Sequence, residues 1–400
     1  MNQTNILIIT LWCISIALVF KYKKWFYLLI PYAIFVLNEC AFIATGMSVY
    51  QDKDITENFY DLSILSTRYG HIDHNYSEGY YPNDDYNITP KQAEVNKFNK
   101  ILEYLGAEKG DVILDMGCGT CSFGEYCATK GIHVIGLTLS SEQVKLCEHK
   151  KVEALQRNFM DYHPELAGVA DHILILGSSE HIATGPHNQQ RSFIRKHEEM
   201  QIMLKHCKKY VKSNPTKPQR VFFSGLHLNE KFADTWEVFV LQRSYGGTLM
   251  LNAPELDIVS AADAVGIKKV AVRDSTKEYF LATALNEHHF GNPAPFASKY
   301  MVGLLVLGLL YPYGFYMYVY YVCGIWMWMF DWNLHFESNK NYNLKSMDER
   351  PCTLWWYVGE ISSPTKQQKI ANTELATHYC GFLGGDQPHI GTDGAKCWKA

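Results

Sequence analysis

The sequence predicts an α/β protein with a doubly wound, mostly parallel sheet, and three observations support this prediction. Residues 112–114 form a short apolar run that ends in an acid and two glycines, as a buried parallel strand before a tight turn does. Residues 122–130 then have the character of a helix whose N-terminus faces that turn. A second strand is expected at 133–137, and a second helix begins at Ser140, with Gln143 placed to complete a capping box. In such sheets the ligand binds at the carboxyl ends of the strands, where the free amides of a helix N-terminus suit an anionic group.

Composition narrows the class of protein. The chain has 400 residues, which permits two or three units, and its 37 basic and 41 acidic residues give no indication of a nucleic-acid partner. The 11 cysteines have no framework spacing and are expected to be mostly reduced, in a protein that faces the cytosol. Cys118 and Cys121 have metal-ligand spacing, but no second pair accompanies them, so no metal site is predicted.

Two apolar stretches open the chain and predict a membrane-anchoring helical hairpin over residues 1–47, or a pair of helices in the membrane plane. Residues 6–20 are short for a full span, whereas residues 25–47 are long enough. The lysines between the stretches favour the cytosolic side of a membrane. If both stretches crossed, the rest of the chain would lie on the opposite side, and a hairpin that dips in and returns removes that conflict.

Two motifs carry a specific resemblance to a known family. The turn Asp115-Met-Gly-Cys-Gly-Thr resembles the cofactor loop of class I S-adenosylmethionine (SAM) methyltransferases, although Cys121 stands where that loop usually has a third glycine. Most members end the second strand with an acid. Thr138-Leu-Ser-Ser-Glu-Gln143 instead resembles the cyclopropane-fatty-acyl-phospholipid synthase and mycolic-acid methyltransferase family. The resemblance covers about residues 60–285.

The resemblance implies SAM as the cofactor and a set of residues that hold it. These residues match the family's motifs by position: Tyr76, Ser77, Asp115, Gly117, Cys118, Gly119, Thr138, Leu139, Gln143 and Asn158. Tyr76 and Ser77 belong to a lid segment expected over 48–95, in which Tyr60-Asp-Leu-Ser and Tyr76-Ser-Glu-Gly resemble the segment before the family's SAM fold. After the third strand, Asn158 is preferred over Asp161 as the partner of the adenine amino group.

The same resemblance implies the class I SAM-methyltransferase fold for a domain over 96–299, a Rossmann-like sheet closed by an antiparallel hairpin. The remaining elements are expected as an amphipathic helix at 90–105, a strand at 172–176, a long helix at 191–212, a strand at 221–226, and the hairpin from 270–273 and 279–285.

Residues 300–332 give the strongest membrane signal in the chain. They are long enough to span a bilayer and carry no charge between Met301 and Phe330. Tyrosines and tryptophans gather in the second half, as they do at membrane interfaces. One or two transmembrane segments are therefore expected, followed by a C-terminal tail over 333–400 in which no chemistry is recognised.

Methyl transfer to an alkene leaves a carbocation, from which a base must remove a proton. The resemblance implies that this base is a bicarbonate held by a Cys, a Glu, a His, a backbone amide and a Tyr. At the matching positions this chain has Glu180 and Tyr279, but Glu78 replaces the Cys and Ser224 replaces the His, with His227 as an alternative donor nearby. Glu78 is expected either to act as the general base itself or to be a solvated lid residue. If Glu78 and Glu180 lie close together, their repulsion should also raise the pKa of one of the two carboxyl groups.

These features predict a membrane-associated SAM-dependent methyltransferase that adds a methyl or cyclopropane group to an unsaturated acyl chain of a membrane lipid. An integral or monotopic position is expected, with the catalytic domain facing the cytosol. Two alternatives remain open. One is a SAM-dependent N-methyltransferase of a small or lipid-linked amine, for which a carboxylate such as Glu78 or Glu180 is suited. The other is a non-catalytic membrane protein that keeps the SAM fold. The oligomeric state is left open.

Overall fold

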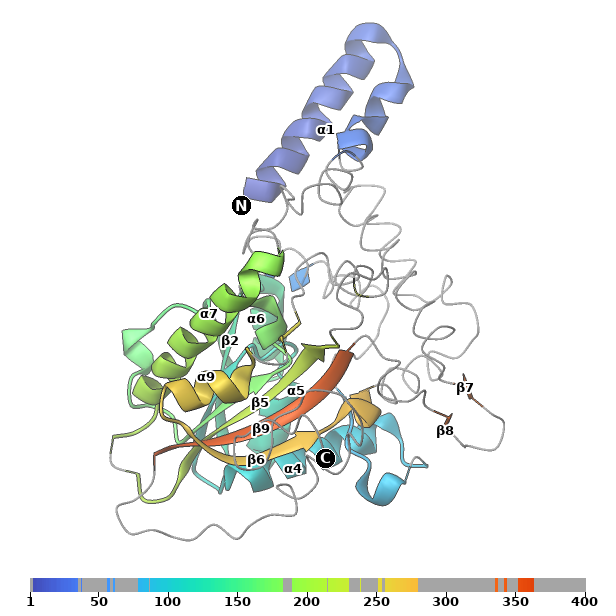
Figure 1. Ribbon diagram of the computed structural model, residues 1–400. Helices are drawn as coiled ribbons and strands as arrows, with labels where there is room; N and C mark the ends of the chain where they lie inside the picture. The colour runs from blue at the N-terminus through green and yellow to red at the C-terminus, as the bar shows by residue number, and fades with distance from the viewer. Residues whose placement is uncertain are drawn as a thin grey trace.

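The computed structural model contains an α/β domain and an N-terminal helical hairpin (Figure 1). The structure describes residues 3–34, 37, 56–57, 60–61, 78–85, 87–182, 189–213, 215–229, 238, 251–253, 256–279, 335–336, 342–343 and 352–362. The predicted transmembrane stretch at 300–332 lies outside the described residues.

The described strands of the domain form one sheet in the order β3-β2-β1-β4-β5-β9-β6. Its strands are β1 (Val112–Met116), β2 (His133–Thr138), β3 (Glu153–Gln156), β4 (His172–Leu176), β5 (Gln219–Leu228), β6 (Lys268–Asp274) and β9 (Cys352–Ser362). β1 to β5 pair in parallel, while β9 lies antiparallel between β5 and β6. This is the predicted doubly wound sheet, and its strands from β1 to β5 lie where the sequence predicts them.

The closing antiparallel pair differs from the predicted hairpin. β6 pairs with β9, which comes from the stretch expected to be a tail, and residues 280–285 of the predicted second strand lie outside the described residues. Tyr279 belongs to a helical turn, and its backbone amide donates to Ser275 O at 3.0 Å. β9 is buried along nearly its whole length, because it lies between two other strands and is covered on both faces.

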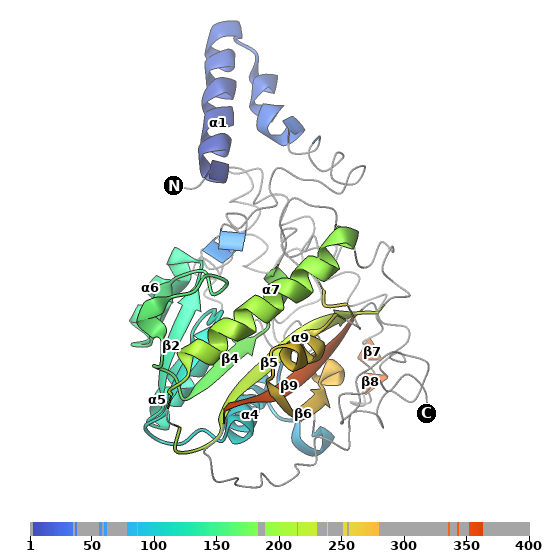
Figure 2. The same ribbon diagram turned by 60° about the vertical axis from the view of Figure 1, so that its left-hand side comes forward.

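Helices cover both faces of the sheet (Figure 2). They are α4 (Pro90–Leu105), α5 (Ser122–Thr129), α6 (Ser141–His149), α7 (Gln189–Tyr210) and α9 (Ile258–Ala264). One apolar core joins α4 and α5 to the sheet around Phe222 and Trp356. The other joins α7 and α9 to the opposite face around Phe223 and Tyr357. Alternate residues of β5 and β9 therefore belong to different cores, as the two-residue period of a strand requires.

Shorter described elements connect these parts: η2 (Pro82–Asp84), η3 (Pro164–Leu166), η4 (Ser179–His181), β7 (His335–Phe336) and β8 (Tyr342–Asn343). β7 and β8 pair with each other in a separate two-stranded sheet.

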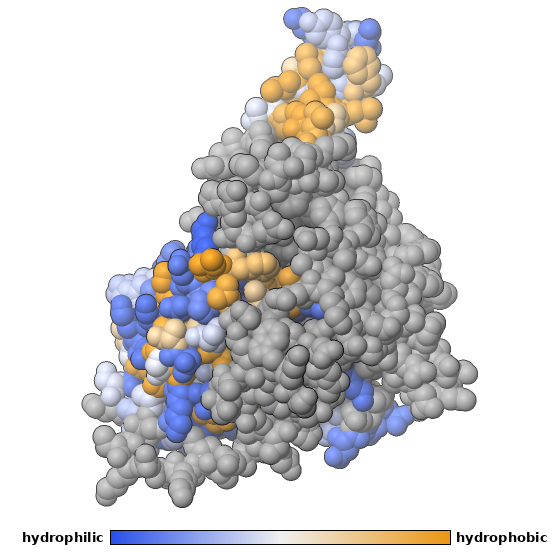
Figure 3. All heavy atoms as spheres, viewed as in Figure 1, coloured by the Kyte–Doolittle hydropathy of each residue, from blue (hydrophilic) through white to orange (hydrophobic). Residues whose placement is uncertain are grey.

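The N-terminal segment is a helical hairpin that projects from the α/β domain in both ribbon views (Figures 1 and 2). α1 (Gln3–Tyr22) is followed by Lys23, whose φ of 56° reverses the direction of the chain. η1 (Trp25–Leu29) then begins the second arm of the hairpin. Hydrophobic residues gather on this hairpin below a more hydrophilic tip (Figure 3). Within the described part of the chain, no helix combines the length and apolar character needed to cross a membrane.

Candidate active site

The glycine-rich turn leaves β1 at the carboxyl edge of the sheet and folds against β2. The amides of Gly117 and Cys118 both donate to Leu137 O, at 2.9 and 3.0 Å. Gly117 has a φ of 105°, and a Cβ there would lie 2.4 Å from Cβ of Ser178, so a side chain does not fit. Gly119 has a φ of 53°, and no described atom lies within 4 Å of its would-be Cβ. The turn therefore has an open side on which a ligand can approach the backbone.

Asp115 lies near the end of β1 and is only 3% exposed. Burial raises its pKa to about 7. Its Oδ1 accepts no hydrogen bond from the described residues. A buried carboxylate oxygen without a partner, next to the glycine-rich turn, fits the positively charged amino group of the methionine part of SAM.

The residues after β2 form a second wall of the site. Thr138 Oγ1 donates to Gln143 Oε1 at 2.5 Å and accepts from the amide of Ser140 at 3.1 Å. Ser140 caps α6 by accepting from the amide of Gln143 at 3.0 Å. Only half of the predicted capping box forms, because the Gln143 side chain turns to Thr138 instead of the Ser140 amide. Leu139 O accepts from Nε2 of Gln156 at 3.1 Å, which ties this wall to β3.

Asn158 follows β3 at the same edge of the sheet. Its Oδ1 accepts from the amide of Met160 at 3.0 Å, and its carbonyl oxygen lies 2.8 Å from Nε2 of His163. This turn fixes Asn158 in place, whereas the alternative, Asp161, is exposed. The role of Asn158 in adenine recognition stays a prediction.

Cys121, at the usual third-glycine position, has a φ of 58° in the left-handed region and is disulfide-bonded to Cys147 of α6. The expectation of reduced cysteines is wrong for this pair. The sulfur atoms of Cys118, Cys121 and Cys147 lie within 4.8 Å of one another. Cys118 keeps its thiol, and burial raises the pKa of that thiol. The disulfide links the cofactor loop to α6.

Glu180 lies on η4 and is 3% exposed. Its Oε1 accepts from the amide of Leu226 at 2.8 Å, and its Oε2 accepts from Oγ of Ser179 at 3.3 Å. Burial raises the pKa of Glu180, while the positive charge of Lys196 lowers it. Lys196, on α7, is itself buried, and burial lowers its pKa to about 7 against the opposing charge of Glu180. Glu180 and Lys196 therefore form an electrostatic pair at the edge of the sheet.

Glu78 is buried at 4% exposure, so the interpretation as a solvated lid residue is wrong. Trp356 Nε1 donates to its Oε1 at 2.7 Å, and Ser224 Oγ donates to the same oxygen at 3.3 Å. Lys97, on α4, is fully buried, and burial lowers its pKa while the charge of Glu78 opposes this. Burial is the main cause that raises the pKa of Glu180, and not the second carboxylate that the sequence suggested.

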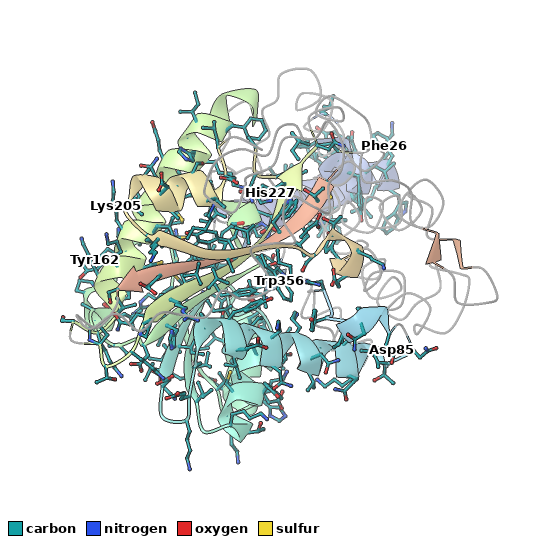
Figure 4. The ribbon with its side chains drawn as sticks, turned by 60° about the horizontal axis from the view of Figure 1, so that its bottom comes forward. Phe26, Asp85, Tyr162, Lys205, His227 and Trp356 are labelled. Carbon is teal, nitrogen blue, oxygen red and sulfur yellow. A yellow bond between two sulfur atoms is a disulfide. The ribbon has the colours of Figure 1, made fainter. Side chains whose placement is uncertain are left out.

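His227 does not compensate for Ser224. Residues three apart on a strand point to opposite faces, and His227 faces α7 and α9 while Trp356, beside Ser224, faces α4 (Figure 4). His227 Nδ1 lies 3.2 Å from Gly225 O, and its Nε2 lies 3.9 Å from Oδ2 of Asp257. His227 therefore makes these contacts on the face of the sheet opposite to Ser224.

Tyr279 is 8% exposed and follows β6 at the carboxyl edge, on the helical turn described above. Among the described residues the hydrogen-bond partners of Glu180 are Leu226 and Ser179, so the role of Tyr279 beside Glu180 stays a prediction. Tyr76 and Ser77 lie outside the described residues.

Three residues of the site, Lys97, Lys196 and Trp356, were not predicted from the sequence. A signal for the lysines was available, since each stands on the apolar stripe of its helix. Ala93, Lys97, Ile101 and Leu105 follow one another at intervals of four and are all fully buried; Lys196, Met200 and Leu204 repeat the pattern. A lysine on such a stripe is a buried charge that requires a partner.

The chain is similar to enzymes of known families. Residues 47–235 match the family described as mycolic acid cyclopropane synthetase. A probable fatty acid methyltransferase of Mycobacterium tuberculosis is 30% identical over 167 residues, 40% of this chain and 37% of that protein. The cyclopropane-fatty-acyl-phospholipid synthase of Escherichia coli K12 is 32% identical over 123 residues, 30% of each chain. The alignments thus span about a third of the length of these curated relatives.

Solved structures share the fold. A mycolic acid cyclopropane synthase complexed with SAH and CTAB superposes with a TM-score of 0.52 at 15% identity, covering 76% of this chain and 96% of that one. A geranyl diphosphate methyltransferase in complex with GPP and sinefungin gives a TM-score of 0.51 at 12% identity, covering 78% and 99%. At these identities the likeness concerns the fold. The likeness to these structures shows the class I SAM-methyltransferase fold, and residues 47–235 match the mycolic acid cyclopropane synthetase family.

Proposed function

We propose that this chain transfers a methyl group from SAM to an unsaturated lipid acyl chain and completes the reaction as a methyl-branched or cyclopropane product. One observation carries the proposal. Within the segment that matches the family, a buried carboxylate, Glu180, is held on the amide of Leu226 at the carboxyl edge of the sheet. The resemblance assigns this Glu to the proton-removing site, and the curated relatives are named for fatty acids and fatty-acyl phospholipids.

SAM is the cofactor, and the described residues fit it. Asp115 Oδ1 offers a carboxylate oxygen to the amino group, and the open side of Gly119 admits the ligand to the backbone. Thr138 and Gln143 offer neutral hydrogen-bonding groups to the ribose hydroxyls. When bound, SAM supplies the methyl group as an electrophile from a positively charged sulfur.

Local charge favours an apolar acceptor over an amine. Each buried glutamate of the site has a buried lysine within electrostatic reach: Lys97 for Glu78 and Lys196 for Glu180. A cationic amine would bind through unpaired negative charge in the site, and the positive charges of these lysines reduce that attraction. The binding of an uncharged alkene does not depend on this attraction.

Membrane association is part of the proposal and rests on where the apolar stretches join the fold. β6 ends at Asp274 and β9 begins at Cys352, both at the carboxyl edge that holds the site, and the apolar stretch 300–332 lies between them in the sequence. The N-terminal hairpin exposes large apolar side chains: Phe20 is 70%, Trp25 is 76% and Leu29 is 61% exposed. Both features favour an acceptor that belongs to a membrane lipid.

The test is transfer of labelled methyl from SAM to a total membrane lipid extract by the detergent-purified full chain, followed by hydrolysis of the lipids. We expect label in the fatty-acid fraction, with mass separating methyl-branched from cyclopropane products. Glu180→Gln should lose at least about 100-fold in rate, because it alters the carboxylate that the resemblance places in the proton-removing site. Glu199→Gln, on the exposed side of α7 in an ion pair with Arg195, should retain full activity.

Other outcomes would overturn the proposal. Label confined to the head-group or water-soluble fraction would make the acceptor an amine or hydroxyl. Absence of label together with failure to bind SAM would favour a non-catalytic protein.

A further inference from the structure

Glu78 has one oxygen fixed and one open. Both of its hydrogen bonds, from Trp356 Nε1 at 2.7 Å and from Ser224 Oγ at 3.3 Å, go to Oε1. Among the described residues Oε2 accepts none. Ser224 and Trp356 face each other across β5 and β9 in register, so the two donors come from a rigid part of the sheet. The carboxylate is therefore held in one orientation with an oxygen left over.

The position of this carboxylate places it at the reaction edge of the sheet. Ser224 pairs with Leu176, the last residue of β4, and Ser224 O accepts from the amide of Gly177 at 3.1 Å. Two residues farther along β5, the amide of Leu226 holds Glu180. The loop between β4 and Glu180 also packs on the cofactor turn, since Oγ of Ser178 donates to Met116 O at 2.6 Å. Glu78 is thus connected through one loop and one strand to both Glu180 and the cofactor turn.

A purely structural ion pair does not account for this arrangement. A buried charged pair is stabilising only when its hydrogen-bonding capacity is filled, and replacing such a pair by apolar residues is often neutral. Here Lys97 acts on Glu78 electrostatically, yet the described residues leave Oε2 unfilled. The two donors fix the orientation of the carboxylate and leave Oε2 available to accept a proton.

We infer that Glu78 is the general base of this enzyme and that Trp356 is the residue that positions it, an inference that rests on the proposed function. After the new carbon–carbon bond has formed, the acceptor carries a positive charge on the neighbouring carbon. Oε2 of Glu78 takes one proton from the added methyl group or from an adjacent carbon. The electron pair of that C–H bond closes the cyclopropane ring or a double bond, so the cation is neutralised. Glu78, now a neutral carboxylic acid, returns the proton to water.

Trp356 contributes a donor that never titrates. The indole N–H only donates, so it fixes Oε1 without competing for the proton. Its ring is also held from the other side, with the guanidinium carbon of Arg273 5.0 Å from the ring centre. Trp356→Phe keeps the ring and removes the donor.

The experiment uses the full chain in detergent with SAM and the lipid extract, and compares Glu78→Gln, Trp356→Phe and Glu94→Gln. Glu94 is the matched control, because it also acts electrostatically on Lys97 but pairs with Lys91 outside the site. We expect Glu78→Gln to lose at least about 100-fold in kcat with its SAH affinity and Tm unchanged. Glu94→Gln should keep the wild-type rate.

Trp356→Phe separates positioning from folding. Loss of a hydrogen bond to the charged form favours the neutral form, so the acid limb of its kcat profile should move to higher pH while its activity at high pH recovers. A uniform loss at every pH would instead mean that Trp356 only supports the fold. That result would overturn its positioning role.

The second readout is independent of turnover: bicarbonate binding to the SAH-loaded full chain, measured by calorimetry. With Glu78 in the site we expect no binding to the wild type and no stimulation of turnover by bicarbonate. Bicarbonate binding, bicarbonate-dependent activity, or an active Glu78→Gln variant would each overturn the inference while leaving acyl-chain methylation intact. A wild type that labels no acyl chain, by contrast, defeats the proposed function itself.

Discussion

The hydroxyl of Tyr60 lies 2.6 Å from Nε2 of His181, and the tyrosine ring stands edge-on to the imidazole. The next residue, Asp61, accepts from Oγ of Ser140 at 2.5 Å and from the amide of Glu142 at 3.2 Å. His181 belongs to the loop that carries Glu180, and Ser140 begins α6, which carries Gln143. Tyr60 and Asp61 therefore fasten the segment that precedes the domain to both parts of the site.

Tyr60→Phe should weaken SAM binding by about fivefold, because one hydrogen bond contributes about 1 kcal/mol. The ring contact with His181 remains, so Tm should change little. Calorimetric titration with SAM measures the affinity. Tyr126→Phe is the matched control, since it loses a hydroxyl bond to Asn99 on the outer surface of the domain. Equal affinities for wild type and Tyr60→Phe would show that the docked segment does not support the cofactor.

SAM affinity should depend on pH through Asp115. Burial raises the pKa of this carboxyl to about 7, so below pH 7 the free protein holds it protonated. Binding a cationic amino group requires the ionised form, and the dissociation constant should therefore rise as pH falls below 7, by up to about tenfold per unit. Titrations between pH 5.5 and 7.5 (on the order of one unit either side of the shift) test this. Asp115→Asn should remove the dependence. Asp257→Asn, which alters another buried carboxyl with a pKa raised to about 6, should keep it.

The same shift makes a prediction for the protein without cofactor. A carboxyl whose pKa is raised in the folded state stabilises the fold below its ordinary pKa, and this stability is lost as pH rises through the folded value. For Asp115 the loss should occur between its ordinary pKa of 3.8 and about 7. Asp115→Asn cannot ionise, so its Tm relative to wild type should improve as pH rises over that window. A Tm difference that stays constant from pH 4 to pH 8 (roughly spanning both pKa values) would contradict the assignment.

The Cys121–Cys147 disulfide should contribute about 3 kcal/mol to stability, as expected for a bridge with a sequence separation of 26. Cys147→Ser should lower Tm in oxidising buffer and match the wild type in reductant. Cys13→Ser, at an exposed free cysteine, serves as the control.

The positive φ of Cys121 allows a second test at the same disulfide. In reductant, Cys121→Gly should be more stable than Cys121→Ala by about 1 kcal/mol, because the φ of 58° favours glycine. The reverse order would mean that the loop relaxes once the disulfide is gone.

The local elements were predictable because their signals are local. β1, β2, β4 and the helices between them follow from apolar runs, caps and glycines within a few residues of each element. β9 was missed because its partners, β5 and β6, lie far away in the sequence, and no short-range rule pairs them. Its continuous apolar and aromatic run, Cys352-Thr-Leu-Trp-Trp-Tyr-Val, is nevertheless typical of a buried central strand.

The residues of the site also fall into those that local motifs predict and those that only the fold brings together. The glycine-rich turn and Glu180 follow strands and were predicted from motifs. The partners of Glu78 were not, because Lys97 comes from α4, Ser224 from β5 and Trp356 from β9. Only the folded sheet brings these three elements together, so a single sequence shows an unexplained glutamate but not what holds it.

The N-terminal hairpin should bind membranes through its exposed apolar side chains. Phe20, Trp25 and Leu29 are each more than half exposed, and burying such a side chain contributes about 1.5 to 3 kcal/mol. The triple variant Phe20→Asp, Trp25→Asp, Leu29→Asp should lose binding to phospholipid vesicles at least tenfold, by about 1.4 kcal/mol or more, in a flotation assay of the full chain. The double variant Ile194→Asp, Ile202→Asp is the matched control, because it removes exposed apolar side chains from α7. If both variants bound vesicles as the wild type does, the hairpin would not be a membrane contact, and the stretch 300–332 would have to supply it.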